Sequence, residues 1–338
     1  MPESFINILE LAEALGLSKS TVSRAFRNKS DISEKTKKYV LEKAKELGYY
    51  PNIYASNLRD SKSKTVAVVM PELANNYFSL AVKGIEKVVQ ANGYHTLIYV
   101  TDSRYEKEAE IVATLFNRRV EGIIMSVSGE GADHDYIDKL KKNNIPLVFF
   151  DRVYEDVKAP KVVTDDYDSS RNATQYFLDN GCKRIAFLVI DKNVSIGKTR
   201  LAGFLDAHKA NGVTPDPRLI VDCSNDLEAS YQKIKHVLKE YRPEAIVSSV
   251  ERLATTAYQV CLDEHIRIPD EVRIISYTNI QVAALLNPAL STIEQPAEEV
   301  GECAARLLLN MLNKKIRPGK TTVLPSKIIH RTSTAFAR

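Results

Sequence analysis

The sequence predicts a small all-α domain at the N-terminus, followed by a larger α/β core with two doubly wound parallel sheets. Three observations indicate this fold class. The first 50 residues contain three short helical stripes, the residues after Lys64 alternate apolar runs with amphipathic segments, and the runs are too many for one ordinary open sheet. A length of 338 residues with 44% hydrophobic residues allows more than one folded domain.

The excess positive charge lies in the N-terminal part of the chain. The first 64 residues contain 12 Lys and Arg against 8 Asp and Glu, and the remaining residues contain 35 charges of each sign. This asymmetry indicates a small anion-binding module attached to a neutral body, although a segment with this charge also arises by chance.

The cysteines and the N-terminus indicate the compartment. The four cysteines lie more than 30 residues apart and show no metal-ligand spacing, so we expect buried thiols in a reducing compartment, with no metal or cofactor. The N-terminus resembles no secretory signal, and no apolar stretch approaches the roughly 20 residues that span a bilayer. We therefore expect a cytoplasmic protein with no membrane partner.

Helical patterns fill the first 50 residues. The apolar stripes predict helices over 9–15, from Ser18 onward, and over 33–47. Gly16 and Gly48 follow the first and third helices, and Ser18 is a preferred N-cap residue for the second. The next segment, YYPNIYASNLRDSKSK, is polar, and its single leucine, Leu58, lies on no apolar stripe. We therefore expect this segment to be a linker.

Short apolar runs after Lys64 predict the strands of the core. These runs cover 65–70, 95–100, 122–127, 146–150, 184–190, 219–221, 245–250 and 272–277. Amphipathic segments such as SLAVKGIEKVVQANG lie between them. This alternation predicts βαβ units and parallel sheets that are covered on both faces by helices.

The stretch GLSKSTVSRAFRNKS predicts the second helix of a helix-turn-helix. Val22, Ala25 and Phe26 fall on one helical stripe that would pack on the first helix. The opposite face would then project polar and basic side chains toward solvent or toward a DNA major groove. We expect base readout from Lys19, Ser20 and Arg24, and phosphate contacts from Ser18, Thr21, Ser23 and Asn28. The competing interpretation is a small helical bundle with a solvated basic face.

Several segments in order resemble the LacI/GalR family of bacterial transcription regulators. They include ILELAEALGLSKSTVSRAFRN, ISEKTKKYVLEKAKELGYYPN, PELANNYFSLAVKGIEKVVQANGY, GCKRIAFLV, TRLAGF and NPALSTIEQP. The resemblance implies a headpiece at 1–50, a hinge at 51–64 and a periplasmic-binding-protein-like core at 65–338. It places the lobes at about 65–162 with 293–320, and at about 163–292 with 321–338.

The resemblance also implies DNA and effector contacts. Lys19, Ser20 and Arg24 match the base-reading positions of the family, and Leu58, with Ala55 and Asn57, matches the hinge that enters the minor groove at the operator centre. The protein would be a nucleoid-associated homodimer on a pseudo-palindromic operator, and it would bind a sugar-like effector between its lobes. The implied effector residues are Tyr77, Phe78, Arg152, Asp165, Arg200, Asn225 and Thr278.

Two departures from the family pattern concern the effector site. The family usually has an acidic residue at position 278, where this chain has Thr278, and Asn-Asp where this chain has Val250-Glu251. With fewer carboxylates and a retained Arg200, the site would suit an acidic or phosphorylated sugar better than the usual site does. The C-terminus shows no leucine heptads, which predicts a dimer and not a tetramer.

Other functions have weaker support. GxGxxG, GxxxxGK[ST] and GxSxG motifs are absent, and the six histidines show no catalytic or ligand spacing, so we expect no enzyme and no catalytic residue. A transport-type binding protein would need a signal peptide. Within the family, the repressor is the leading reading, and a corepressor-dependent or activating regulator is the alternative. A ligand receptor without specific DNA readout is the alternative from a different class.

Overall fold

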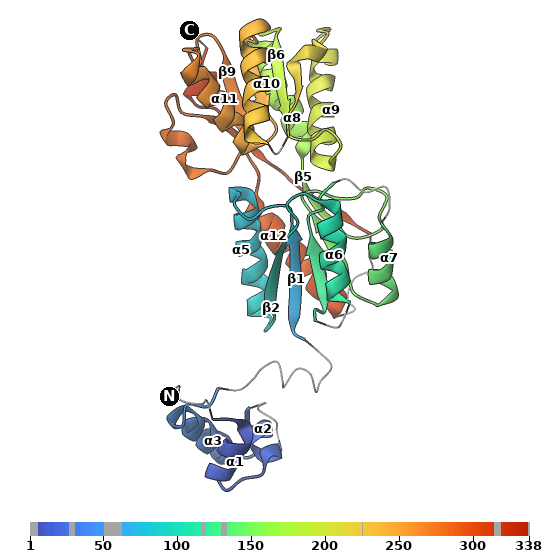
Figure 1. Cartoon of the computed structure of the whole chain (residues 1–338), viewed down its shortest axis with the longest axis vertical. Coiled ribbons are helices and arrows are strands. Elements are labelled where there is room, and N and C mark those ends of the chain that lie inside the picture. The colour runs from blue at the N-terminus through green and yellow to red at the C-terminus, as the bar shows by residue number, and fades with distance from the viewer. Residues whose placement is uncertain are drawn as a thin grey trace. The chain divides into compact units, whose positions relative to one another are not determined.

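The computed structural model describes residues 6–26, 31–50, 63–116, 119–129, 134–224, 226–313 and 319–336. The chain forms two compact units, residues 1–63 and 64–338. Figure 1 labels many of the elements of both units, and each unit is described by itself. Among the described residues, no helix combines the length and the apolarity that are needed to cross a bilayer.

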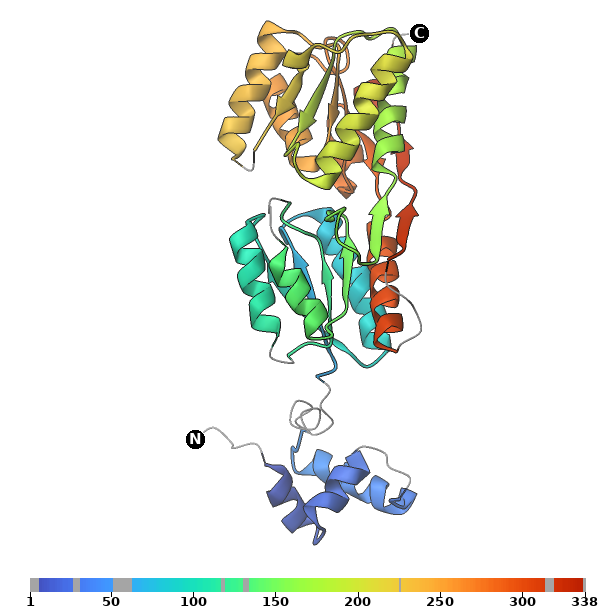
Figure 2. The same ribbon diagram turned by 90° about the vertical axis from the view of Figure 1, so that its right-hand side faces the viewer.

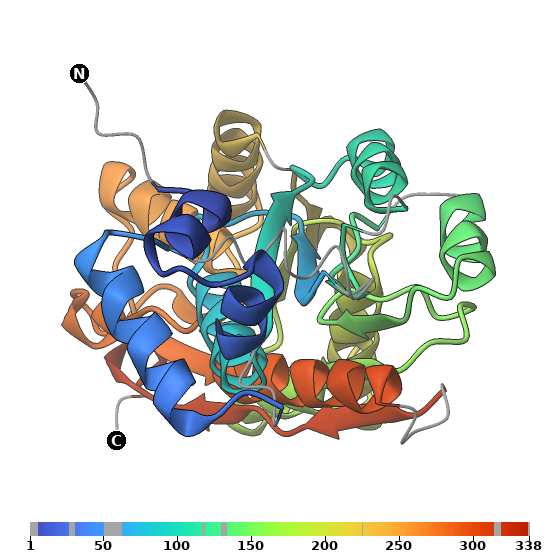
Figure 3. The same ribbon diagram turned by 90° about the horizontal axis from the view of Figure 1, so that it is seen from below.

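The N-terminal unit contains three helices around one small core. They are α1 (Ile8–Ala14), α2 (Lys19–Phe26) and α3 (Glu34–Glu46), of which α3 is the longest (Figure 3). Asn7 and Glu10 form a capping box that fixes the start of α1, and Ser33 caps α3. Leu11, Val22 and Val40, one from each helix, are fully buried together. This core confirms the predicted helix-turn-helix packing.

The first lobe of the core is a six-stranded parallel sheet with the strand order β11-β5-β4-β3-β1-β2. Its strands are β1 (Thr65–Met70), β2 (His95–Val100), β3 (Gly122–Met125), β4 (Leu147–Phe150), β5 (Lys161–Thr164) and β11 (Thr321–Leu324). Helices α5 (Asn76–Ala91) and α12 (Ala297–Leu312) cover one face, and α6 (Tyr105–Leu115) and α7 (Asp135–Lys142) cover the other. Along β1, Val66 and Val68 face the first pair of helices and Ala67 faces the second pair.

The second lobe repeats this architecture with the strand order β12-β10-β9-β8-β6-β7, in which only the β10–β12 pair is antiparallel. Its strands are β6 (Ile185–Val189), β7 (Ile220–Asp222), β8 (Ala245–Ser248), β9 (Arg273–Tyr277), β10 (Ser291–Glu294) and β12 (Lys327–Ile329). Helices α10 (Leu227–Glu240) and α11 (Glu251–Asp263) cover one face, and α8 (Asp166–Asp179) and α9 (Ser195–Ala210) cover the other. Three short 3-10 segments complete the lobe, at Pro217–Leu219, Gln281–Leu285 and Thr332–Thr334.

The chain crosses between the lobes three times, at 164–166, 294–297 and 324–327. Figure 2 shows the green β5 crossing and the red β11–β12 crossing side by side. These crossings lie slightly later in the sequence than the expected boundaries near 162, 292 and 320. The difference arises because β11 extends the first sheet beside β5, whereas β10 lies wholly within the second sheet.

Helices α5 and α12 cross at a distance that only glycine allows. A Cβ atom at Gly301 would lie 2.0 Å from the carbonyl oxygen of Ala81, and a Cβ atom at Gly84 would lie 2.0 Å from that of Glu298. Two ion pairs, Lys83–Glu298 and Lys87–Glu302, join the same helices. The close contact of two backbones therefore fixes how α12 packs beside β4 and β5.

We expect Gly301→Ala to lower the free energy of unfolding by about 1–3 kcal/mol, because the added methyl group forces two backbones apart in a packed core. Urea unfolding of the full chain measures this loss. Glu299→Ala on the exposed face of the same helix is the control and should change stability by no more than about 0.5 kcal/mol. Equal stability of Gly301→Ala and the control would contradict the packing argument.

Candidate DNA-binding and effector-binding sites

Helix α2 presents the face that the sequence predicted. Lys19, Ser20 and Arg24 are exposed, whereas Val22 and Ala25 are buried against the other two helices. The exposed trio lies within the first two turns of the helix, and a recognition helix contacts base edges with this part. The base contacts of these residues stay a prediction.

The proposed phosphate-binding residues begin the same helix. The hydroxyl of Ser18 accepts the backbone N–H of Thr21 at 3.1 Å, which confirms Ser18 as the N-cap. The same hydroxyl lies 2.8 Å from those of Ser20 and Thr21. Thr21 and Ser23 are half-buried, so their hydroxyls lie at the edge of the exposed face. Asn28, Ala55, Asn57 and Leu58 lie outside the described residues.

Arg24 is held by neighbouring groups within the headpiece. Its Nη1 lies 2.9 Å from Oδ2 of Asp31, and its Nε donates to the carbonyl of Ser20 at 3.3 Å. About half of each charged side chain in the pair with Asp31 is exposed. Such a pair contributes at most about 1 kcal/mol, so it orients the Arg24 side chain and costs little to break.

Both lobes of the core line one cavity at the carboxyl ends of their strands, which is the usual ligand position in open parallel sheets. The lining residues are Glu72, Asn75, Tyr77, Phe78, Asp151, Arg152, Ile196, Arg200, Val250, Glu251, Tyr277, Thr278, Asn279 and Gln295. Of the predicted effector residues, the structure brings Tyr77, Phe78, Arg152, Arg200 and Thr278 together here. Asn225 lies outside the described residues.

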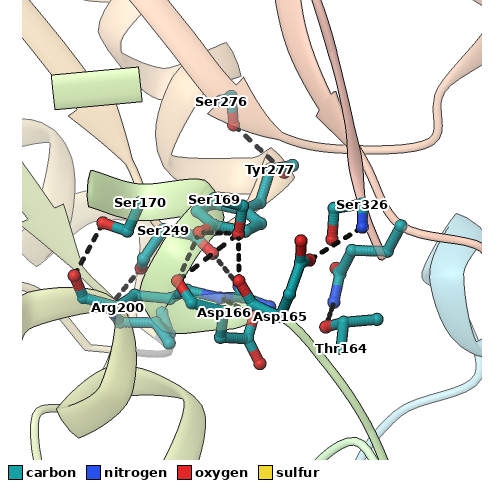
Figure 4. A network of polar contacts seen from close by, with 12 residues as sticks. Thr164, Asp165, Asp166, Ser169, Ser170, Arg200, Ser249, Ser276, Tyr277 and Ser326 are labelled. Atoms are coloured by element: carbon teal, nitrogen blue, oxygen red, sulfur yellow. Dashed lines mark hydrogen bonds and ion pairs between the residues drawn. The ribbon is translucent and has the colours of Figure 1, made fainter. Parts of the chain in front are cut away.

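Asp165 does not line this cavity, unlike the five residues just named. Its Oδ1 accepts the backbone N–H of Ser326 at 2.7 Å, and its own N–H donates to the carbonyl of Leu324 at 3.2 Å (Figure 4). Asp165 therefore ties two of the three lobe crossings together. Asp165 therefore lies at the hinge in this structure, and its predicted contact with an effector stays a prediction.

The next residue, Asp166, forms an ion pair with Arg200, which lines the cavity. Its Oδ1 lies 2.7 Å from Nε of Arg200, and both side chains are almost fully buried (Figure 4). Nη1 of Arg200 donates to the carbonyl of Ser249, and the guanidinium lies 3.8 Å from the ring centroid of Tyr277. Burial alone would lower the pKa of Arg200, but Asp166, Tyr277 and Asp151 raise it, so the arginine stays charged.

Four buried polar atoms on the cavity lining have no hydrogen-bond partner within the described part of the chain. They are Nη2 of Arg200, Nε of Arg152, the hydroxyl of Tyr77 and Oδ1 of Asn279. A buried polar atom without a partner costs about 1–3 kcal/mol. Several such atoms around one cavity indicate that a polar ligand completes the site.

Asp151 lies between these groups at the end of β4. Its backbone φ is 58°, in the left-handed region, which places the carboxylate beside Ser126 at 3.3 Å. Burial raises the pKa of Asp151 to about 6, and Arg152 and Arg200 partly oppose this rise. Burial also lowers the pKa of Arg152. The site therefore contains one carboxyl group that titrates near neutral pH.

This raised pKa predicts a pH-dependent stability. The unfolded carboxyl group has a pKa near 3.9, so the folded protein holds this proton more strongly between about pH 4 and 6. The contribution of Asp151 to stability is therefore largest below pH 4 and is lost as the pH rises through about 6. We expect Asp151→Asn to remove this part of the pH profile in thermal unfolding at pH 4–7, while Asp168→Asn, on an exposed side chain, leaves the profile unchanged. Identical profiles for the wild type and Asp151→Asn would contradict the assignment.

Thr278 and Glu251, the two departures noted in the sequence, meet in space. The Thr278 hydroxyl donates to Oε2 of Glu251 at 2.8 Å, and both residues line the cavity. The carboxylate that is absent at position 278 is therefore supplied from the start of α11. Glu72, Asp151 and Glu251 all line the cavity, so the described part of the site contains three carboxylates. The expected preference for an acidic or phosphorylated sugar stays a prediction.

Direct contacts join the two lobes across the cleft. Nη2 of Arg252 lies 3.3 Å from Oε1 of Glu72, and Nδ2 of Asn76 donates to Oε1 of Glu251 at 3.4 Å. Farther along the cleft, the backbone N–H of Val153 donates to the Ser195 hydroxyl at 3.0 Å. The cavity between the lobes has a volume of about 40 Å³, which is room for about three water molecules.

A second cavity of about 260 Å³ adjoins the first, and Arg152 lines both of them. Ser103 and Ser128 of the first lobe and Asp191 and Asp222 of the second lobe contribute to its polar lining. Nη1 of Arg152 donates to the Ser103 hydroxyl at 3.2 Å. The cleft therefore offers a small inner space and a larger outer space.

Sequence reasoning missed most of the acidic residues of the cleft. Glu72, Asp151, Asp166 and Glu251 each follow a strand end or begin a helix, and this position was the available signal. This signal is not specific, because isolated acidic residues also begin helices on the surface.

A helix-turn-helix with an exposed basic face and a two-lobed core around a polar cavity together define a ligand-regulated DNA-binding protein. Residues 63–332 match the family of periplasmic binding proteins and the sugar binding domain of the LacI family, and residues 7–52 match the lacI family of bacterial regulatory proteins. The chain belongs to the LacI family. It is a DNA-binding transcriptional regulator with an effector-binding core.

Individual relatives cover nearly the whole chain. The chain is 29% identical over 332 residues to the HTH-type transcriptional regulator RegA of Clostridium saccharobutylicum, covering 97% of this chain and 99% of RegA. A LacI family regulator from Enterococcus faecium with bound ribose is 26% identical, with a TM-score of 0.72, and covers 81% of this chain and 100% of its own. The lac repressor dimer bound to operator, at 23% identity, shares the fold with a TM-score of 0.85 over 98% of this chain and 99% of its own.

Proposed function

We propose that this protein is a homodimeric repressor whose affinity for a pseudo-palindromic operator is set by a sugar-like effector bound between the lobes. The supporting observation is the interlobe cavity, whose lining contains four buried polar atoms without a partner. The ribose bound to the Enterococcus faecium relative supports a carbohydrate as the effector class. As a DNA-binding transcriptional regulator, the protein would act in the cytoplasm at the nucleoid.

The effector would act by changing the separation of the lobes. The inner cavity of about 40 Å³ is far smaller than the roughly 300–1,000 Å³ of small-molecule sites, so a sugar ring requires the cleft to widen. Widening breaks Glu72–Arg252 and Asn76–Glu251 and bends the crossings that Asp165 and Ser326 join. An effector that binds one lobe arrangement more tightly shifts the population toward it, and this coupling is reciprocal with DNA binding.

Exposed apolar groups support the dimer. β2 is an edge strand of the first sheet, and Leu97 and Ile98 on it are 38% and 42% exposed. On the second lobe, Leu285 is 82% exposed and Val282 lies near it in the chain. Edge strands with apolar side chains and exposed apolar patches are typical association surfaces. Light scattering of the full chain should give a dimer, and a monomer would contradict this part of the proposal.

Selection from a random DNA duplex library tests the proposed sequence-specific DNA binding. We expect the purified full chain to enrich a pseudo-palindrome, with binding that weakens as salt increases because phosphate contacts release counterions. Repeating the binding with neutral sugars, sugar phosphates and sugar acids then identifies the effector class. A compound that weakens operator binding is an inducer, and one that strengthens it is a corepressor. A protein that binds a sugar and enriches no sequence would be a ligand receptor without specific DNA readout.

A further inference from the structure

The residue at which the chain enters the first lobe has a strained backbone. Lys64 directly precedes β1, and the two compact units of the chain meet between residues 63 and 64. The φ angle of Lys64 is 50°, in the left-handed region that residues with a Cβ atom rarely adopt. Such strain persists only where neighbouring groups hold the backbone, and it is often part of a function. The groups that hold Lys64 are therefore candidates for a functional role.

Neighbouring strands hold both backbone polar groups of Lys64. Its N–H donates to Oε1 of Glu121 at 2.7 Å, and its carbonyl accepts the N–H of His95 at 2.8 Å. The N–H of Glu121 in turn donates to the carbonyl of Thr65 at 2.8 Å. Glu121 precedes β3 and His95 begins β2, and these two strands flank β1 in the sheet. Lys64 is therefore hydrogen-bonded to segments on both sides of its own strand.

Tyr94 contacts both Lys64 and Glu121. Its hydroxyl donates to Oε2 of Glu121 at 3.1 Å, and its ring centroid lies 4.2 Å from Nζ of Lys64 in a cation–π contact. Burial and the Glu121 carboxylate raise the pKa of Tyr94 to about 12, so the hydroxyl keeps the proton that it donates. We call Lys64, Tyr94 and Glu121 the linker clamp. Glu121 is its central member, because its two oxygens accept hydrogen bonds from both of the other residues.

We propose that Glu121 is a positioning residue for DNA binding: through the linker clamp it fixes the direction in which the chain leaves the core, and so the spacing of the two half-sites that a dimer binds. This inference rests on the proposed dimer and its pseudo-palindromic operator. In such a dimer, the second headpiece binds at a high effective concentration only where its connection to the core matches the distance between the half-sites. A fixed exit from the core narrows the range of spacings that match.

Competition binding of the full chain to three duplexes tests this proposal. The duplexes are the pseudo-palindrome selected from the random library and two versions of it, with one base pair inserted or removed at the centre. The spacing penalty is the ratio of the affinity for the selected duplex to the affinity for an altered one. We expect a spacing penalty of at least about tenfold for the wild type, because a fixed exit matches one spacing best.

Glu121→Gln is expected to reduce this spacing penalty at least threefold. Glutamine has one acceptor oxygen where the linker clamp uses two, so one of the hydrogen bonds from Lys64 and Tyr94 is lost. A looser exit lets the headpieces reach the altered spacings. Binding to the selected pseudo-palindrome should weaken about three- to tenfold, because the exit then has to be ordered when DNA binds. A residue that only stabilised the fold would not change the ratio between duplexes.

Two further variants separate positioning from charge and from folding. Glu110→Gln removes the same charge from an exposed position of α6 and should bind all three duplexes like the wild type. Lys64→Gly keeps the N–H that donates to Glu121, removes the contact with the Tyr94 ring and relieves the strained backbone. Its melting temperature should lie within about 4 °C of the wild type, because the relief of strain offsets the lost contact. Its spacing penalty should nevertheless fall at least threefold, and it replaces Glu121→Gln if that variant fails to fold by circular dichroism.

The possible results distinguish the two proposals. A wild type that enriches no pseudo-palindrome, or that is a monomer, would refute the proposed repressor and this inference with it. A wild type that selects an operator and binds the altered spacings equally well would refute the fixed exit alone. A fall of less than threefold in the spacing penalty of Glu121→Gln, or of Lys64→Gly in its place, would refute the role of the linker clamp and leave the proposed repressor intact.

Discussion

Arg200→Ala is expected to lower the free energy of unfolding by about 3–5 kcal/mol and to abolish the response of operator binding to an effector. The reason is that Arg200 and Asp166 form an ion pair in which both side chains are buried, and removal of one partner leaves the other as an uncompensated buried charge. The cation–π contact with Tyr277 is lost in the same variant. Urea unfolding at pH 8 measures the stability, and operator binding with and without the effector measures the response.

The matched control is Arg218→Ala. Arg218 also pairs with an aspartate, Asp216, at 2.6 Å, but its side chain is 65% exposed, so the expected loss is at most about 1 kcal/mol.

Burial raises the pKa of Asp166 and Arg200 opposes this rise, so Asp166 in the Arg200→Ala variant should take up a proton more readily. A carboxyl group with a raised pKa in the folded protein contributes less stability as the pH rises. The loss in free energy of unfolding caused by Arg200→Ala should therefore be smaller at pH 5 than at pH 8. A loss similar to that of Arg218→Ala would show that the buried Arg200–Asp166 pair does not stabilise the fold.

Arg24→Ala is expected to weaken binding to the selected operator by about 1–3 kcal/mol at each half-site, or about 2–6 kcal/mol for a dimer. The planar guanidinium can donate two hydrogen bonds to one guanine, and alanine cannot replace them. The loss should be specific: binding to random duplex should change much less, because that binding depends mainly on phosphate contacts. Competition binding with the selected operator and with random duplex of the same length measures both quantities.

Asp31→Asn provides the complementary variant. It removes the partner that holds Arg24 in the free headpiece, at a stability cost of at most about 1 kcal/mol because the pair is exposed. We expect operator affinity to stay equal or to rise. Lys38→Ala, which changes an exposed basic residue of α3, is the control for nonspecific charge and should lower the affinity for both duplexes alike. An equal loss of specific and random binding in Arg24→Ala would refute the base-reading role.

The sequence determined the class of fold because its signals are local. The apolar run 65–70 became β1 and the run 95–100 became β2, each with the same bounds, and α3 is within one residue of the predicted helix at each end. The other six predicted runs each contain most or all of a strand. Side chains buried on both faces make such strands visible as continuous apolar segments.

The strands at the lobe crossings were not predictable in this way. β5 (KVVT), β10 (STIE), β11 (TTVL) and β12 (KII) are three or four residues long, and each of them begins with a polar residue. They lie at or near the end of a sheet, and their pairing depends on partners far away in the sequence, such as β5 with β11. Short segments of this kind are defined by tertiary pairing and not by their own pattern.

For the sites, the sequence by itself determined the exposed basic face of α2 and the buried positions beneath it, because spacing along one helix is a local property. The five predicted residues that line the cleft were implied by the family resemblance and not by a local pattern. Only the tertiary structure decided that Asp165 ties the hinge, that Asp166 holds Arg200 and that Glu251 lies beside Thr278. The physical reason is that these roles depend on distances between side chains that are 27 to 161 residues apart, and folding alone sets such distances.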